Sequence, residues 1–254
     1  MSIRLEKRGA VAHLLIDRAA KRNAFTQEMW EVLPQRLGEA MADAAVRAVI
    51  LRSAEAGAFC AGADIAEFGA GALDPAWRAR NQDAIRRAEY ELARAEKPVI
   101  AAVDGDCVGG GCGLAIACDL RVASPRARFG ITPAKLGLVY SLHDTKLLVD
   151  LVGPAQAKRI LFTAQLLGAE EAHRIGLIEM VENDPVTAAE ALAETIAAAS
   201  SFSVRNTKKM VRRILDGQND DTAETRALFD SAFEGEDFAE GVSAFLQKRK
   251  ARFP

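Results

Sequence analysis

The 254-residue sequence lacks the features of membrane-spanning, secreted and metal-binding proteins. No apolar run approaches the roughly 20 residues needed to cross a bilayer, and no targeting segment is evident. None of the four cysteines has the paired C-x-x-C spacing of a zinc site. We interpret Cys60, Cys107, Cys112 and Cys118 as small packing residues of a reduced, cytoplasmic protein.

Excess charge of one sign is also missing. The 33 basic residues nearly balance the 35 acidic ones, which leaves a formal net charge of −2. This balance argues against a nucleic acid or an anionic membrane as partner. Phosphate-binding loops, nucleotide fingerprints, metal clusters and serine triads are absent as well. Half of the residues are apolar, as is usual for a globular enzyme.

The residues up to about 187 alternate between strand and helix patterns, which predicts an α/β fold. The pattern begins with a hairpin around Gly9 and a helix after Thr26, in which Pro34 is expected to cause a kink or a break. The remaining residues are almost purely helical, with apolar spacing that includes Val242 and Phe245. We therefore predict a core of residues 1–190, which would bind the substrate, and a helical oligomerisation region of residues 191–254.

Two glycine-rich turns, each following a predicted strand, are the most informative segments. They are FCAGADI at Phe59–Ile65 and GGGCG at Gly109–Gly113. Glycines that enter a helix leave backbone N–H groups uncovered, and the helix N-terminus stabilises developing negative charge. A tight turn before a buried helix would explain GGGCG alone. The two turns together predict an oxyanion hole made of main-chain amides.

Five motifs in order resemble the crotonase superfamily, the enoyl-CoA hydratase/isomerase family. They are RAAKRNAF from Arg18, FCAGADI from Phe59, KPVIAAVDGDCVGGGC from Lys97, CDLRVASPRARFGITPAKLG from Cys118 and AFLQKRKARF from Ala244. The resemblance implies a spiral of repeated ββα units with a C-terminal helical trimerisation region, assembled as a homotrimer or a dimer of trimers. It also implies an acyl-CoA thioester as substrate, with no cofactor beyond the coenzyme A of that substrate.

The resemblance also assigns site residues. The amides of Ala63 and Gly110 would hold the thioester oxygen. The coenzyme A site would be lined by Lys21, Asn23, Ala24, Ala61, Asp64 and Ile65, with Lys248 of the basic tail near the phosphates.

Two glutamates that hydratases of this family use are replaced. One follows the GGGC segment, where this chain has Gly113, and the other follows a proline in FGxPE, where this chain has Pro133. Neither residue can accept a proton, and positioned acid/base groups contribute about 10²–10⁴-fold to rate. The sequence therefore predicts slow or undetectable hydration of crotonyl-CoA.

The segment ITPAKLGLVYSLHD at Ile131–Asp144 resembles methylmalonyl-CoA decarboxylase and aligns Tyr140 with an active-site residue. A tyrosine hydroxyl could protonate the enolate that loss of carbon dioxide generates. A decarboxylase-type or other non-hydratase reaction is therefore the main prediction. One alternative is a hydratase or double-bond isomerase with a differently placed acid/base group, for which Glu67, His143 and Asp144 are candidates. The other alternative is a catalytically silent acyl-CoA-binding protein.

Overall fold

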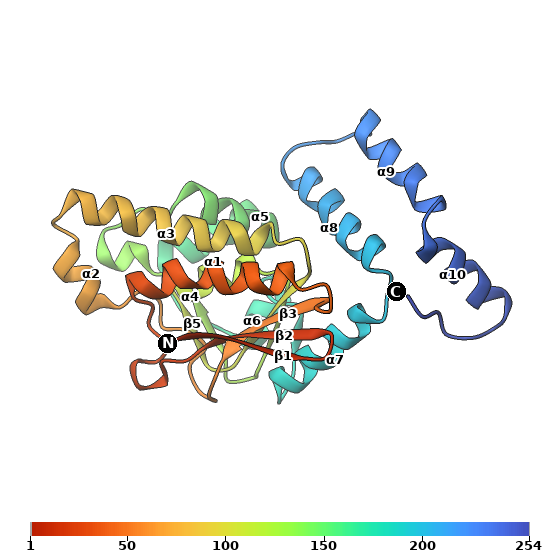
Figure 1. Cartoon of the computed structure of the whole chain (residues 1–254). Coiled ribbons are helices and arrows are strands. Elements are labelled where there is room, and N and C mark those ends of the chain that lie inside the picture. Colours follow the sequence, from red (N-terminus) through yellow and green to blue (C-terminus); the bar gives the residue numbers. More distant parts are fainter. Residues whose placement is uncertain (1, 254) are drawn as a thin grey trace.

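The computed structural model describes residues 2–253 and has an α/β body from which a helical tail projects (Figure 1). The body is built on a six-stranded sheet in the order β1-β2-β3-β4-β6-β9. Its strands are β1 (Ile3–Arg8), β2 (Val11–Ile16), β3 (Ala48–Ser53), β4 (Val99–Val103), β6 (Leu120–Ala123) and β9 (Met180–Val181). The strands β1 and β2 form the predicted antiparallel hairpin, and all later neighbours pair in parallel. The predicted α/β class is confirmed.

A smaller three-stranded sheet carries the glycine-rich helix of the site. It consists of β5 (Asp106–Val108), β7 (Arg128–Gly130) and β8 (Leu167–Gly168), in that order. The strands β5 and β7 are parallel, whereas β7 and β8 are antiparallel. Because β5 ends at Val108, the chain turns at Gly109 directly into the next helix.

Helices cover both faces of the larger sheet. The body contains α1 (Gln27–Ala42), α2 (Ile65–Gly71), α3 (Pro75–Ala93), α4 (Gly110–Ala117), α5 (Leu142–Thr163), α6 (Ala169–Arg174) and α7 (Pro185–Ala197), with short 3₁₀ turns at Ala19–Lys21 and Pro133–Leu136. The helices α1, α3 and α4 lie on one side of the sheet, and α7 packs across β3 and β4 on the other (Figure 1). Within residues 2–253, none of the helices has the length and apolarity of a membrane span.

The predicted break at Pro34 is wrong, because α1 runs without interruption from Gln27 to Ala42. Pro34 is buried together with Leu33 and Leu37 on the face that packs against the core. Burial of this face offsets the one backbone hydrogen bond that proline removes. An interruption is found instead in α5, where Gly153 has a φ of 72° immediately before Pro154.

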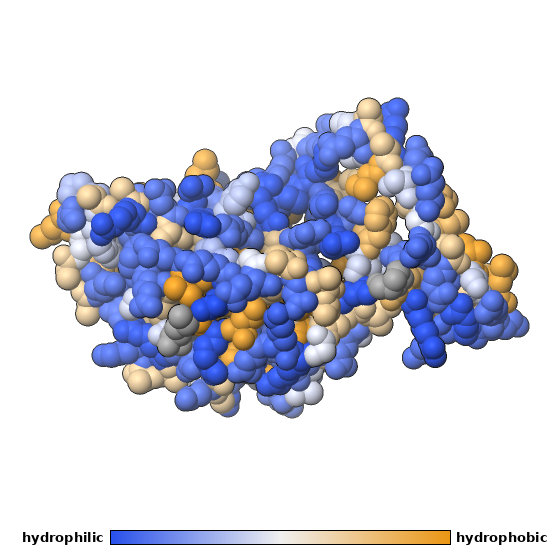
Figure 2. Space-filling model, in the orientation of Figure 1, coloured by the Kyte–Doolittle hydropathy of each residue, from blue (hydrophilic) through white to orange (hydrophobic). Residues whose placement is uncertain are grey.

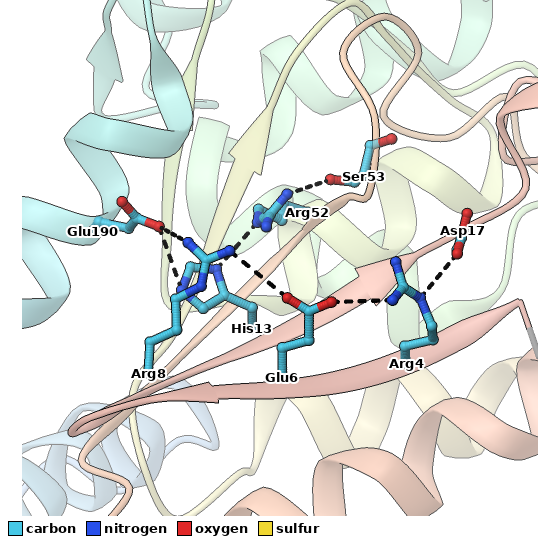
Figure 3. Close-up of polar contacts among 8 residues, drawn as sticks. All are labelled: Arg4, Glu6, Arg8, His13, Asp17, Arg52, Ser53 and Glu190. Atoms are coloured by element: carbon cyan, nitrogen blue, oxygen red, sulfur yellow. Dashed lines mark hydrogen bonds and ion pairs between the residues drawn. The ribbon is translucent and has the colours of Figure 1, made fainter.

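A polar cluster around His13 links the N-terminal hairpin to α7 (Figure 3). The Arg52 Nε group donates to His13 Nδ1 at 3.1 Å, so the ring carries its proton on Nε2, which faces Glu190 Oε1 at 3.5 Å. Burial, followed by the charges of Arg52 and Arg8, lowers the pKa of His13. The imidazole is therefore neutral, and Arg8 supplies the ion pair to Glu190 at 3.0 Å. This arrangement gives His13 a structural role.

The tail consists of α8 (Ser201–Leu215), α9 (Ala223–Phe233) and α10 (Glu236–Leu246), which project from the body (Figure 1). The helix α8 is tied to the body by ion pairs from Lys208 to Asp119 at 2.6 Å and from Arg94 to Asp216 at 2.8 Å. The predicted boundary at residue 190 falls inside α7, which packs on the sheet. The division into two regions stays a prediction.

Candidate active site

The first glycine-rich turn holds the main chain around Ala63 in a defined orientation. Phe25 donates its N–H to Gly62 O and accepts from Asp64 N, both at 2.8 Å, in a parallel bridge with Ala63. Because the two neighbours of Ala63 supply the groups that bond Phe25, the N–H of Ala63 itself points to the opposite side. The amide of Ala63 is therefore turned away from this bridge.

The second turn brings another amide close to the first. Gly109 has a φ of 58° and precedes Gly110, the first residue of α4, whose N–H has no partner within the helix. A Cβ on Gly62 would lie only 2.9 Å from Val108 O and 3.5 Å from Gly110 N, and Gly62 has a φ of 94°. Only glycine at position 62 allows this approach. The geometry favours the predicted oxyanion hole of Ala63 and Gly110.

A buried carboxyl group occupies the space where a side chain at position 113 would lie. A Cβ added to Gly113 would overlap Oε1 of Glu89 and would lie 3.1 Å from both the Glu89 Cδ atom and the Tyr140 hydroxyl oxygen. Glu89 belongs to α3 and is only 1% exposed. The structure thus places a carboxyl group beside Gly113, although it comes from a different helix than the family motif uses.

Asp144 lies against Glu89 at the start of α5. The hydroxyl of Ser141 caps this helix by accepting from Asp144 N at 3.1 Å and donates to Asp144 Oδ2 at 2.6 Å. Burial, followed by a hydrogen bond with Asp144 and the charge of Asp144, raises the pKa of Glu89 well above its ordinary value. Burial of Glu89 therefore favours the protonated form of its carboxyl group.

Two further predicted residues border the carboxyl pair. Burial, followed by the charges of Glu89 and Asp144, raises the pKa of Tyr140 well above its ordinary value, so its hydroxyl is a hydrogen-bond donor rather than a strong acid. Burial lowers the pKa of His143, which is a neutral imidazole beside the ring of Tyr90. The structure thus brings Tyr140, His143 and Asp144 together, and their roles in catalysis stay a prediction.

Glu67, the remaining acid/base candidate, is engaged elsewhere. Its Oε2 atom accepts the backbone N–H of Gln27 at 2.8 Å and so fixes the first turn of α1 to α2. Its neighbour Asp64 caps α2 by accepting from Ala66 N at 3.1 Å and Glu67 N at 3.2 Å. Both carboxylates have structural contacts, and neither is part of the group around Glu89.

The residues predicted to bind coenzyme A fall into a loop cluster and a separate tail residue. The Asn23 side chain is buried and bonds Arg18 N at 2.9 Å, Ser53 Oγ at 2.8 Å and Ala58 O at 2.8 Å. The Asn23 side chain therefore holds the loop in shape. A bound coenzyme A would contact the neighbouring residues and the main chain instead. These neighbours include the exposed Lys21 and Ile65, together with Ala24 and Ala61. Lys248 follows α10 in the tail, and α10 lies at the opposite end of the molecule from α2 (Figure 1).

Comparison with known proteins identifies the family. Residues 6–254 match the sequence profile of the enoyl-CoA hydratase/isomerase family. This chain belongs to the enoyl-CoA hydratase/isomerase family. It is 35% identical to the short-chain-enoyl-CoA hydratase of Clostridium acetobutylicum, over 97% of this chain and 95% of that protein. It is also 35% identical to the crotonyl-CoA hydratase of Syntrophomonas wolfei, over 99% of this chain and 97% of that protein.

Solved structures agree with this assignment. The fold matches an enoyl-CoA hydratase/isomerase family protein of Hyphomonas neptunium with a TM-score of 0.97 and 42% identity, covering 100% of this chain and 98% of that one. It matches an enoyl-CoA hydratase of Bacillus anthracis with a TM-score of 0.92 and 28% identity, covering 100% and 99%. The family predicted from the motifs is confirmed. None of these findings supports the likeness to methylmalonyl-CoA decarboxylase.

Glu89 is not among the site residues that the sequence predicted. Its helix is rich in charge, with RRAEYELARAEK spanning the residues around it, and such a segment is usually a solvated face. One signal was present, because Glu89 lies three residues before Leu92 and four before Ala93, which are both buried. An acidic residue on the buried stripe of a helix is unusual enough to mark a candidate.

Proposed function

We propose that this family member hydrates the double bond of a 2-enoyl-CoA thioester. The observation that carries the proposal is the close approach of the Gly62 and Gly110 segments, with a Cβ on Gly62 only 3.5 Å from Gly110 N. Two amides at such a place can stabilise the enolate oxygen that forms when water adds to the double bond. The names of the hydratases of Clostridium acetobutylicum and Syntrophomonas wolfei support this reaction over decarboxylation.

The acid/base group would differ in position from that of the family motif. The expectation of slow crotonyl-CoA hydration assumed that no carboxyl group lies near Gly113, but Glu89 lies there.

A shift of the double bond is the second candidate reaction. It is favoured by Pro133 at the second position of the motif, because returning a proton from one group requires fewer carboxylates than activating water. In both cases coenzyme A is part of the substrate, and we propose no further cofactor.

A panel of thioesters separates the candidate reactions. The purified protein is incubated with crotonyl-CoA, a 3-enoyl-CoA and methylmalonyl-CoA, and the products are analysed by mass spectrometry. We expect crotonyl-CoA to gain the mass of water. An isomerised product keeps its mass but moves its double bond, and a decarboxylated product loses the mass of carbon dioxide. Loss of carbon dioxide as the only reaction, or binding without turnover, would contradict the proposal.

We further propose that the chain assembles as a homotrimer or a dimer of trimers through its tail. Exposed apolar side chains gather on α9 and α10, and the tail shows apolar residues on its surface (Figure 2). They are Phe229, Phe233, Phe238, Val242, Phe245 and Leu246, of which Phe245 is 83% exposed. Covering such a surface is favourable at roughly 25 cal/mol per Å² of apolar area.

The four free cysteines, all buried, support the proposed cytoplasmic location.

Sedimentation velocity tests the assembly. We expect a trimeric or hexameric species at micromolar protein concentration, and Phe245→Glu should shift the distribution toward smaller species by placing a charge in the covered surface. Phe162→Glu is the matched control, because Phe162 is similarly exposed, at 76%, on α5 of the body. A wild-type protein that sediments as a monomer would show that the tail has another partner or none.

A further inference from the structure

Four of the buried polar atoms that lack a partner within residues 2–253 belong to one small group of side chains. They are Glu89 Oε2, Asp144 Oδ1, the Tyr140 hydroxyl and His143 Nε2. Buried polar groups are normally hydrogen-bonded, so such a concentration at one place requires an explanation. The group adjoins Gly113 on α4, where Glu89 and Tyr140 both approach the same point.

The two carboxyl groups of the pair account for part of this pattern. Ionised carboxylates only accept hydrogen bonds, so Glu89 and Asp144 can bond each other only if one of them carries a proton. The Ser141 hydroxyl donates to Asp144 Oδ2 at 2.6 Å and holds this carboxyl group in place beside Glu89. A pair of carboxyl groups that shares one proton carries one negative charge and can both give and take a proton.

The position of the pair relative to the two amides follows from helix geometry. Gly110 and Gly113 are three residues apart in α4, so they lie on the same face, one turn from each other. A Cβ in a helix points toward the N-terminus, so the space beside Gly113 that Glu89 Oε1 fills extends toward the amide of Gly110. A carboxyl group in this space can reach the carbon atoms next to a thioester whose oxygen is held by that amide.

We propose that Glu89 and Asp144 act as a single acid/base pair on the acyl group and take over the work of the absent motif glutamates. The proposal rests on the proposed function. In hydration, the ionised member of the pair removes a proton from water as the water oxygen bonds to C3. The electrons of the double bond move to the thioester oxygen, and the protonated member then gives its proton to C2. The pair ends with one proton and one charge, as it began.

The surroundings of the pair suit this role. Its titratable neighbours are Cys112 of α4, Tyr140 of the preceding loop and His143 of α5, and Cys107 of β5 lies near Tyr140. Burial comes first among the causes that raise the pKa of Glu89, and the charge of Asp144 adds to it. Tyr140 contributes a neutral hydroxyl that can donate to the ionised form or to the substrate, so we assign it a positioning role.

The first test compares Glu89→Gln and Asp144→Asn with Glu91→Gln, which replaces a carboxylate of the same helix that pairs with Arg87 at 2.7 Å. We expect the first two substitutions to lower kcat on the best enoyl-CoA at least tenfold, with acyl-CoA affinity within threefold of wild type. Glu91→Gln should stay within twofold. Wild-type kcat in both Glu89→Gln and Asp144→Asn would overturn the proposal.

The second test separates this inference from the proposed reaction. Exchange of the C2 hydrogens of butyryl-CoA in heavy water needs the pair and the two amides but no double bond. If wild type exchanges and Glu89→Gln does not, the pair is supported even where no enoyl-CoA is turned over. Exchange at the wild-type rate in Glu89→Gln overturns the pair and leaves the proposed function standing. A wild type with neither exchange nor turnover overturns both.

A pH profile covers the case in which Glu89→Gln fails to fold. The wild-type rate should fall on the alkaline side where the pair loses its shared proton. Because the Asp144 charge raises the pKa of Glu89, Asp144→Asn should move this alkaline limb to lower pH. A merely structural Asp144 would reduce stability without shifting the limb, and an unshifted limb overturns the proposal.

Discussion

Substituting proline for Ala63 should lower kcat by about 10²–10³-fold, which is the usual effect of losing one donor of an oxyanion hole. Proline has no N–H, so the substitution removes the donor that we assign to the enolate oxygen. The bridge to Phe25 uses Gly62 O and Asp64 N, so its two hydrogen bonds do not involve the lost group. Proline restricts the residue before it through contact with that residue's Cβ, and Gly62 has none. The folded structure should therefore tolerate the substitution better than it would at most positions.

The measurement is single-turnover and steady-state kinetics on the enoyl-CoA that the panel identifies. Ala63→Ser is the matched control, because it changes the side chain and keeps the amide, and its kcat should stay within a few-fold of wild type. Thermal melting and the affinity for a saturated acyl-CoA show whether the proline variant is folded. A folded Ala63→Pro variant with wild-type turnover would remove Ala63 from the oxyanion hole.

The main-chain part of the site could be predicted from the sequence because its backbone geometry requires particular residue types, above all glycine. An amide donor needs only a backbone held in the right place, and Gly62, Gly109 and Gly110 are at positions where other residues would clash or be strained. The spacing of strand, glycine turn and helix was visible in both segments. The hairpin of β1 and β2 was also predictable, because apolar and polar residues alternate along β1 before the turn at Gly9.

The side-chain part could not be predicted, because it depends on how α3, α4 and α5 pack together. Glu89 reaches Gly113 from a neighbouring helix, and no local pattern records which helix will cover a glycine. The uninterrupted α1 has a similar origin, because burial of Pro34 against the core outweighs the low helix propensity of proline. A sequence motif can indicate an acid/base group only among residues close to it in the chain, whereas the fold brings Glu89 to Gly113 across a helix interface.

The structure also changes the interpretation of Tyr140. The sequence suggested that its hydroxyl protonates an enolate. A tyrosine whose pKa is raised by burial and by two adjacent carboxyl groups is a weaker acid than usual. Glu89 is a carboxylic acid whose protonated form is favoured by burial, and it is the better candidate for giving a proton to carbon. The tyrosine and the carboxyl pair therefore have complementary roles, in which Tyr140 orients and the pair transfers the proton.

The most direct structural test of this site is Gly113→Ala, which should destabilise the protein by about 1–3 kcal/mol through overpacking. The added methyl group would overlap Glu89 Oε1, and this side chain is buried beside Asp144, so it has little freedom to move aside. Gly38→Ala is the matched control. Gly38 lies inside α1, and an added Cβ has no atom within 4 Å, so this substitution should stabilise by about 0.5–1 kcal/mol through helix propensity alone.

A double-mutant cycle in chemical denaturation then assigns the penalty to its source. With Glu89→Ala in the background, Gly113→Ala should lose most of its cost, which gives a coupling free energy of about 1–2 kcal/mol between the two positions. Gly38→Ala should show no coupling to Glu89, since it lies on another helix with open space around it. If Gly113→Ala is as well tolerated as Gly38→Ala in the wild-type background, the Glu89 carboxyl does not occupy the space beside Gly113. In that case the proton would have to come from elsewhere, because the acid/base pair depends on this one placement.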